Sequence, residues 1–256
     1  MSKPSVTAIV PAYNEEATVG EVLQVILSSP LIDELICIND GSTDNTLEVI
    51  NKFKPKIKVI DIPNNRGKGF AMAQGIKKAN SEILLFLDGD LLTLTNIHIE
   101  SLLNPLLQST ARATIGNMVN KAGFSIFSGI SGQRAYFKSD LIPYLNEISN
   151  SRYGVEVYMN SIIPKQNVQK VVLMNLDTLF KHQKHDTITA IEEYKTEILE
   201  IAKVLYKNNR ITKNSLLKLR EIQKISNKGI IWSKLNEITD IELKTTLQRL
   251  FSSSQD

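Results

Sequence analysis

The sequence predicts an α/β fold, in which a mostly parallel sheet is flanked by helices and followed by a helical C-terminal extension. Two observations predict it. In residues 1–92, short apolar runs alternate with longer stretches whose apolar residues recur at helical spacing, which is typical of a parallel sheet covered on both faces. From about residue 187 the pattern is helical, with few glycines. We therefore expect a domain at 1–186 and an extension at 187–256.

The individual elements follow from these patterns. Strands are expected at the apolar runs 6–11, 34–39, 56–62 and 82–88. Helices are expected between them, where apolar residues lie three and four apart, at 17–29, 44–53 and 67–79. The remaining elements are a helix at 96–109, a strand at 111–119, a Gly/Ser-rich stretch at 121–137, a helix at 154–165 and a strand at 167–176.

Composition excludes several classes of protein. The net charge of +3 is too small to indicate a nucleic-acid partner. The single cysteine, Cys37, lies in an apolar run, which suits a core residue in a reducing compartment. The first apolar run is too short for a signal peptide, and no window reaches the roughly 20 apolar residues of a membrane span. We expect a cytoplasmic protein, with peripheral contact at the inner membrane face as an open alternative.

Three of the predicted strands end in polar or acidic residues. The first runs into Pro-Ala-Tyr-Asn-Glu at 11–15, the second ends at Asp40, and the fourth ends at Asp88 and Asp90. The carboxyl ends of neighbouring parallel strands lie at one edge of the sheet, where ligands of such folds bind. One acidic strand end is ordinary, but three at one edge indicate a binding site.

Asp88 and Asp90 flank a single glycine in the stretch LLFLDGDLL. Paired carboxylates can hold a hard divalent cation, Mg²⁺ or Mn²⁺, which keeps other coordination positions for phosphates or water. Asp-Gly-Asp taken alone is also a common turn sequence.

Lys68 stands between Gly67 and Gly69 at the start of a predicted helix. The glycines would let a ligand approach the backbone, and the helix N-terminus and the ammonium would attract a diphosphate. The alternative is a helix start with a surface lysine. The stretch lacks the Ser/Thr of a P-loop.

Four motifs together resemble a known family. The stretches VTAIVPAYNEEATVGEVL, INDGSTDNT, NRGKGFAMAQGI and LLFLDGDLL have the order and spacing of family 2 glycosyltransferases with the Rossmann-like GT-A fold. The resemblance covers residues 4–185 and is strongest to small bacterial relatives of glucosyl-phosphoglycerate synthases and polyprenyl-phosphate sugar transferases. It implies an inverting, metal-dependent transferase. The implied donor is a nucleotide-diphosphate sugar, with UDP-glucose as the default. The implied acceptor carries a hydroxyl or phosphate and is a small phosphorylated molecule or a lipid phosphate.

The resemblance implies roles for individual residues. Residues that would contact the nucleotide and its diphosphate are Pro11, Tyr13, Glu15, Asp40, Lys68 and Asp88. Asp88 and Asp90 would also hold the metal. The loop of Gly132, Gln133 and Arg134 would lie near the donor sugar and the acceptor phosphate.

The resemblance implies catalytic roles for Glu156, Arg134 and Asp90. Arg134 and Lys68 would help the metal to stabilise the leaving diphosphate. Glu156 would face the acceptor and serve as general base towards a hydroxyl, or would only orient a phosphate. The alternative for Glu156 is a solvated helix residue.

One position departs from the family pattern. Relatives carry a histidine after the late strand that often completes the metal site, and an ungapped alignment puts Thr178 there. His182 lies about one turn further on. Either the metal lacks its histidine, or the loop shifts and His182 becomes the third ligand.

The extension is basic and amphipathic. Between residues 201 and 234, nine lysines and arginines stand against Glu221, with apolar residues and Trp232 interleaved. Such a segment could lie on an anionic membrane, or it could pack on the catalytic domain or form a homodimer. The sequence leaves these alternatives open.

Two rival functions remain. A weakened relative would bind a nucleotide or a partner without turnover, which the missing histidine supports. A nucleotidyltransferase would need a basic, glycine-rich loop after the first strand, whereas this chain has the acidic PAYNEE.

Overall fold

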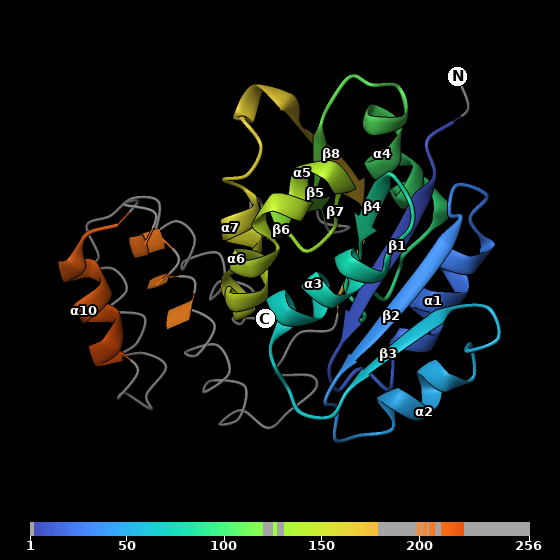
Figure 1. The fold of residues 1–256 in the computed structure, drawn as a ribbon, viewed down its shortest axis with the longest axis horizontal. Helices are drawn as coiled ribbons and strands as arrows, with labels where there is room; N and C mark the ends of the chain where they lie inside the picture. Colours follow the sequence, from blue (N-terminus) through green and yellow to red (C-terminus); the bar gives the residue numbers. More distant parts are fainter. Residues whose placement is uncertain are drawn as a thin grey trace.

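The computed structural model describes residues 3–119, 125–126, 131–178, 199–200, 202–203, 205–207 and 211–222. Within them, an eight-stranded sheet carries helices on both faces (Figure 1). The strands are β1 Val6–Ala12, β2 Glu34–Asp40, β3 Lys58–Ile62, β4 Ile83–Phe86, β5 Ala113–Val119, β6 Ser125–Ile126, β7 Arg134–Phe137 and β8 Val168–Met174. The α/β fold predicted from the sequence is confirmed.

The helices alternate with the strands up to β5. They are α1 Val19–Ser28, α2 Thr46–Asn51, α3 Lys68–Lys78, α4 Asn96–Leu107, α5 Lys138–Leu141, α6 Leu145–Asn150, α7 Val155–Met159 and α10 Lys213–Ile222. Of these, α5, α6 and α7 follow one another after β7. Short 3₁₀ turns are η1 Ile142–Tyr144, η2 Arg152–Gly154 and η3 Lys165–Asn167.

The first four strands are parallel and adjacent in the order β3-β2-β1-β4. Their register pairs Ile9 with Ile36 on one side and with Phe86 on the other. The carboxyl ends of β1, β2 and β4 therefore lie at one edge of the sheet, as the sequence predicts.

The second half of the sheet is mixed. The strand β7 runs antiparallel to both of its neighbours, β4 and β5, while β8 runs parallel to β5. We described residues 121–137 only as a Gly/Ser-rich stretch and predicted no strand in it. The described part of this stretch holds two short strands, β6 and β7, whose apolar pattern is too short to stand out from the glycines around them.

Two apolar layers hold the helices on the sheet. Val6, Ala8 and Val10 of β1 face α1, α2 and α4, whereas Ile9 faces α3, α6 and α7. This alternation follows from the two-residue period of a strand. A sheet buried on both faces explains why its central strands are almost continuously apolar.

The predicted helix at 154–165 is shorter than expected. It ends at Met159 and gives way to a turn and to Pro164, whose ring nitrogen cannot donate a helical hydrogen bond. Within the extension, α10 buries Leu216 and Leu219 and exposes Lys213 and Arg220. The boundary predicted at 186/187 lies outside the described residues.

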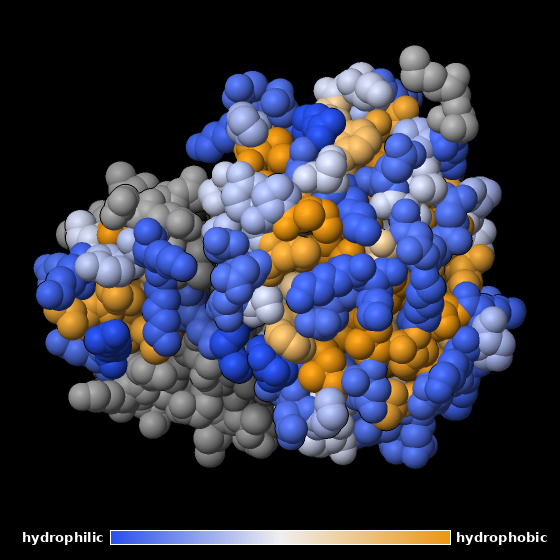
Figure 2. Space-filling view, in the orientation of Figure 1, coloured by the Kyte–Doolittle hydropathy of each residue, from blue (hydrophilic) through white to orange (hydrophobic). Residues whose placement is uncertain are grey.

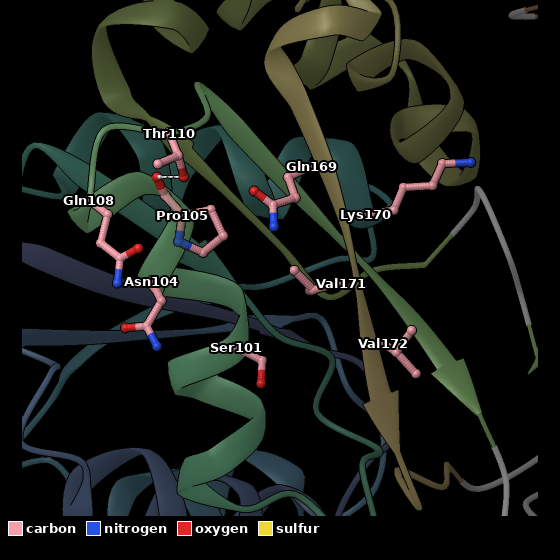
Figure 3. Close-up of a pocket in the computed structure, with 9 residues that line it drawn as sticks. All are labelled: Ser101, Asn104, Pro105, Gln108, Thr110, Gln169, Lys170, Val171 and Val172. Atoms are coloured by element: carbon pink, nitrogen blue, oxygen red, sulfur yellow. Dashed lines mark hydrogen bonds between the residues drawn. The ribbon is translucent and has the colours of Figure 1, made fainter.

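No helix in the described part of the chain is long and apolar enough to cross a membrane. Figure 2 shows that polar side chains cover much of one face, with apolar side chains visible between them. An open hollow of about 450 Å³ lies between α4 and β8 (Figure 3). Gln169 and Lys170 line it, near the amino end of β8, so it lies away from the edge where the acidic strand ends meet.

Candidate active site

The Asp-Gly-Asp segment packs against the end of β1. A β-carbon on Gly89 would lie 3.5 Å from Ala12, from Glu15 and from the carbonyl of Pro11. The buried hydroxyl of Thr18 donates to the carbonyl oxygen of Gly89 at 2.8 Å. The ends of β1 and β4 are therefore joined by direct contact as well as by strand pairing.

The segment that follows β1 is held by the segment that follows β2. The Asn14 side chain, on a residue with φ of 55°, accepts from the Thr43 amide at 2.8 Å. The Glu15 amide donates to the hydroxyl of Thr46 at 2.7 Å. Pro11, Tyr13 and Glu15 are half-buried here, and their predicted nucleotide contacts stay predictions.

Asp40 is buried and shapes the approach to α3. Its carboxylate accepts from the amides of Arg66 and Gly67, at 2.9 and 2.7 Å. Gly67 has a φ of 90°, which a side-chain-bearing residue rarely adopts. Asp40 thus fixes the loop that leads into Lys68, and its predicted contact with the base stays a prediction.

Lys68 joins two of the predicted site residues. Its Nζ lies 2.5 Å from Oδ1 of Asp88 and 2.6 Å from Oε1 of Glu156. The three side chains come from α3, from the loop after β4 and from α7. The exposed fractions of the Lys68 and Asp88 side chains are 22% and 24%, and that of Glu156 is 9%. Neither Lys68 nor Glu156 is the solvated surface residue that the sequence left as an alternative.

Charge pairing outweighs burial in this group. Burial acts to lower the pKa of Lys68, but the carboxylates of Asp88 and Glu156 raise it overall. Burial acts to raise the pKa of Asp88, but Lys68, Gln133 and Arg134 lower it overall. Lys68 and Asp88 are therefore both charged at neutral pH.

The two glycines beside Lys68 allow a close contact within the chain that the sequence did not predict. A β-carbon on Gly67 would press on Arg152, and one on Gly69 would overlap the carbonyl of Ile148. The glycines thus admit the chain's own α6–η2 segment, and the predicted approach of a ligand to this backbone stays a prediction. This close packing brings the start of α3 next to α7, and so brings Lys68 to Glu156.

The predicted loop of Gly132, Gln133 and Arg134 lies against Asp88. The Gln133 side-chain amide donates to Oδ2 of Asp88 at 3.0 Å, and the Ser131 hydroxyl donates to Gln133 Oε1 at 2.7 Å. A β-carbon on Gly132 would overlap the Asp88 carboxylate. Only glycine fits at position 132 without moving Asp88.

Arg134 is fully buried and bridges this loop to α7. Its guanidinium donates twice to the carbonyl of Ser131, at 3.0 and 2.5 Å. It also donates to the carbonyl of Glu156 at 3.2 Å and to the side chain of Asn160 at 3.3 Å. In this geometry Arg134 positions Glu156 and the loop. Its predicted contact with a leaving diphosphate stays a prediction.

Three partners in this network were missing from the predicted site, and one of them is Tyr136, whose hydroxyl accepts from Arg134 at 3.3 Å. Ser131 orients Gln133, and Asn160 receives Arg134. Asn160 stands four residues after Glu156, so helical spacing alone could have placed both on one face of α7. Nothing in the sequence singles out Ser131 from the other serines of its stretch.

The donor set beside Lys68 fits a hard divalent cation. Asp88 and Asp90 offer carboxylate oxygens, and the Lys68 ammonium shows that Asp88 accepts a positive charge at this point. Within the described residues, no cluster of three or more His, Cys, Asp or Glu side chains surrounds a common point. His182, the predicted third ligand, lies outside the described residues.

The segment after β8 begins beside the two aspartates. Leu91, the residue after Asp90, forms a β-bridge with Thr178, and the Leu92 amide donates to the carbonyl of Asp177 at 2.9 Å. Thr178, where the resemblance implies a histidine, therefore lies next to the residue that follows Asp90, and a metal ligand at this point stays a prediction.

Comparison with known proteins places the chain in a family. The family model described as glycosyl transferase family 2 matches residues 7–151, which include the Asp-Gly-Asp segment, Lys68 and the loop at 131–134. The chain belongs to glycosyltransferase family 2. It is an enzyme of the glycosyltransferase class, as the sequence predicted, and the nucleotidyltransferase alternative is excluded.

Two curated relatives of this family 2 glycosyltransferase differ in the length of sequence over which they match it. An uncharacterized glycosyltransferase of Haemophilus influenzae is 28% identical over 206 residues, which is 78% of this chain and 76% of that protein. The poly-β-1,6-N-acetyl-D-glucosamine synthase of Staphylococcus epidermidis is 42% identical over 88 residues, but these are 33% of this chain and 21% of the synthase.

Solved structures share the fold of this family 2 glycosyltransferase. The glucosyl-3-phosphoglycerate synthase of Mycobacterium tuberculosis, in complex with Mn²⁺ and UDP-glucose, superposes with a TM-score of 0.59. Its sequence identity is 20%, over 78% of this chain and 79% of that one. A second mycobacterial protein gives a TM-score of 0.63 at 20% identity, over 82% and 76% of the two chains. The GT-A fold predicted from the motifs is confirmed.

Proposed function

We propose that this family 2 glycosyltransferase transfers a sugar, with inversion, from a nucleotide-diphosphate sugar to a hydroxyl or phosphate acceptor in a reaction that depends on Mg²⁺ or Mn²⁺. One observation carries the proposal. Lys68 contacts both Asp88, on the side of the expected metal and diphosphate, and Glu156, on the side of the expected acceptor. This contact supports a site in which the groups proposed for the donor and for the acceptor lie on either side of the Lys68 ammonium.

The chemistry follows from the charges. In an inverting transfer the acceptor oxygen attacks the anomeric carbon while the bond to the diphosphate oxygen breaks. A divalent cation held by Asp88 and Asp90 would neutralise charge on the leaving diphosphate. Lys68 adds a second positive charge there. Glu156 takes the proton of a hydroxyl acceptor, or orients an acceptor that is already anionic.

The donor and acceptor classes are inferred from relatives. The mycobacterial synthase of the same fold is bound to Mn²⁺, UDP and glucosyl-3-phosphoglycerate in one structure, and to UDP-glucose in another. We therefore propose UDP-glucose as the first donor to test and a small phosphorylated molecule as the first acceptor.

A panel of UDP- and GDP-sugars tests the proposal. Binding and slow hydrolysis of each sugar are measured with Mn²⁺, with Mg²⁺ and after chelation. We expect at least one nucleotide sugar to bind and to be hydrolysed only with a divalent cation. If none binds with either metal, the proposed function is wrong.

Glu156→Gln separates donor binding from transfer. The amide cannot take a proton, so transfer to a hydroxyl acceptor should fall by about 10²-fold or more while donor binding persists. Glu100→Gln on the exposed surface of α4 makes the same chemical change away from the site and should leave transfer unchanged. Equal turnover in Glu156→Gln and the wild type would remove Glu156 from the mechanism.

The presence of Thr178 beside Leu91 keeps a second candidate open. In this candidate the metal lacks a histidine ligand, and the enzyme binds the nucleotide but turns it over poorly. The same panel distinguishes the two, because this candidate predicts nucleotide binding with little hydrolysis or transfer.

A further inference from the structure

The Asp88 carboxylate already has partners for both of its oxygens. Lys68 contacts Oδ1, and the Gln133 amide donates to Oδ2 at 3.0 Å. Lys68 is shared with Glu156, which is buried. One internal cation thus satisfies a predicted metal ligand and a predicted base at the same time.

This contact sets a condition on metal binding. A divalent cation approaching Oδ1 of Asp88 meets the ammonium of Lys68, and like charges a few ångströms apart repel strongly where water is partly excluded. To bind alone, the metal must separate Lys68 from Asp88 and leave the ammonium with one carboxylate. A diphosphate that arrives with the metal carries its own anionic oxygens, and these can pair with the displaced ammonium.

We propose that Lys68 is a specificity-determining residue that makes the site select a metal–nucleoside diphosphate pair over a free divalent cation. The proposal rests on the proposed function, since it assumes that Asp88 is a metal ligand. It also predicts the order in which the donor, the metal and the acceptor gain access to these side chains. The diphosphate draws Lys68 away from Asp88 and Glu156, so that Asp88 becomes available to the metal and Glu156 to the acceptor only when a donor is bound.

Metal titrations without any turnover test the proposal. Mn²⁺ is titrated into the full-length protein, alone and saturated with UDP, and free Mn²⁺ is followed by electron paramagnetic resonance. The wild type should bind Mn²⁺ weakly alone and more tightly with UDP. Lys68→Met should bind Mn²⁺ alone at least about fivefold more tightly than the wild type, and the gain from UDP should shrink by a similar factor.

Three further variants provide the controls. Lys68→Gln also removes the charge, and it takes the place of Lys68→Met in the titration if thermal melts show that Lys68→Met folds poorly. Lys68→Arg keeps the charge and should keep the weak binding of Mn²⁺ alone. Lys77→Met removes an exposed lysine of the same helix, and should match the wild type unless net charge alone governs the affinity.

The outcomes separate this inference from the proposed function. If the wild type binds neither Mn²⁺ nor UDP in either order, the proposed function fails and the inference fails with it. If the wild type binds both, but removing the charge at position 68 leaves the affinity for Mn²⁺ alone unchanged, only the inference is wrong. A gain in Lys77→Met equal to that in Lys68→Met would also overturn it.

Discussion

Asp88 and its neighbours show how a single carboxylate is oriented from several directions. Lys68 takes one oxygen, Gln133 takes the other, and Gly132 leaves room for both. Hydrogen bonds to a metal-binding carboxylate fix its direction and tune its affinity. Replacing any of these neighbours should therefore act by moving or freeing the Asp88 carboxylate.

Gly132→Ala tests this fit. The new methyl group would overlap the Asp88 carboxylate, so the side chain must move away from its contacts. We expect kcat/KM to fall by about 10²-fold, because small displacements of reacting groups have effects of that size. Gly20→Ala in α1 is the control, since its nearest neighbour is a side-chain atom of Val49 at 3.2 Å, away from the site, and full activity is expected there. A fully active Gly132→Ala would contradict the fit.

Lys68→Met should alter stability in a pH-dependent way. The lowered pKa of Asp88 means that the pair stabilises the fold above the unfolded value of about 3.9, and that this contribution is lost as the pH falls through the folded value. The raised pKa of Lys68 means that its contribution is complete below about 10.4 and is lost only as the pH rises through the folded value.

The measurement is denaturant unfolding of the wild type and Lys68→Met. We expect a loss of about 1–3 kcal/mol at about pH 7, nearly the same loss at about pH 9, and a smaller loss at about pH 3. Lys77→Met is the control and should be neutral at all three. A loss that grows towards acid pH would mean that the ion pair is not its source.

At the scale of elements, the four parallel strands and the later strands β5 and β8 were predictable, whereas the short strands β6 and β7 were not. The strands β1, β2 and β4 lie in clear apolar runs of the sequence, and the rule that ligands bind beyond their carboxyl ends predicted Asp40, Asp88 and Asp90 at one edge of the sheet. The strand β7 is four residues long and follows glycines, so local periodicity could not reveal it.

The same contrast holds for the candidate site. Spacing and family motifs named Lys68, Asp88 and Glu156, but no local pattern shows that one lysine would contact both carboxylates. That contact depends on Gly67 and Gly69 packing against the α6–η2 segment, about 80 residues further along the chain. Contacts between segments so far apart in the sequence can be identified only from the three-dimensional structure.

Arg134→Lys tests the link between β7 and α7. A lysine cannot replace the planar guanidinium, which donates to Ser131, Glu156 and Asn160 together. We expect a loss of about 2–3 kcal/mol in the free energy of unfolding. Arg112→Lys is the control, because its ion pair with Asp140 is exposed and should cost about 0–1 kcal/mol. Equal losses in the two variants would mean that Arg134 does not hold these elements together.

At the scale of the whole molecule, the described part of the extension contacts the catalytic domain. Arg152 Nε lies 2.9 Å from Glu200 Oε1, and Leu199, Ala202 and Leu205 are buried. Arg152 also packs on Gly67, so the contact reaches the segment that carries Lys68. This favours packing over membrane binding among the alternatives that the sequence left open.

Flotation with anionic vesicles tests that preference. If the extension packs on the domain, the protein should stay at the bottom of the gradient at low and at high salt. Glu200→Lys, which places like charges at the Arg152 contact, should lower the melting temperature. Binding to phosphatidylglycerol vesicles that disappears at high salt would instead support a membrane role for the basic segment.

The Lys68 ammonium that joins Asp88 and Glu156 also affects the stability of the protein when no metal or donor is bound. In a site whose carboxylates have no internal cation, stripping the metal leaves repelling charges and weakens the fold. Here Lys68 neutralises that repulsion from within. We therefore expect chelators to stop turnover without lowering the melting temperature, so that the enzyme survives metal starvation folded and regains activity as soon as the metal and donor return.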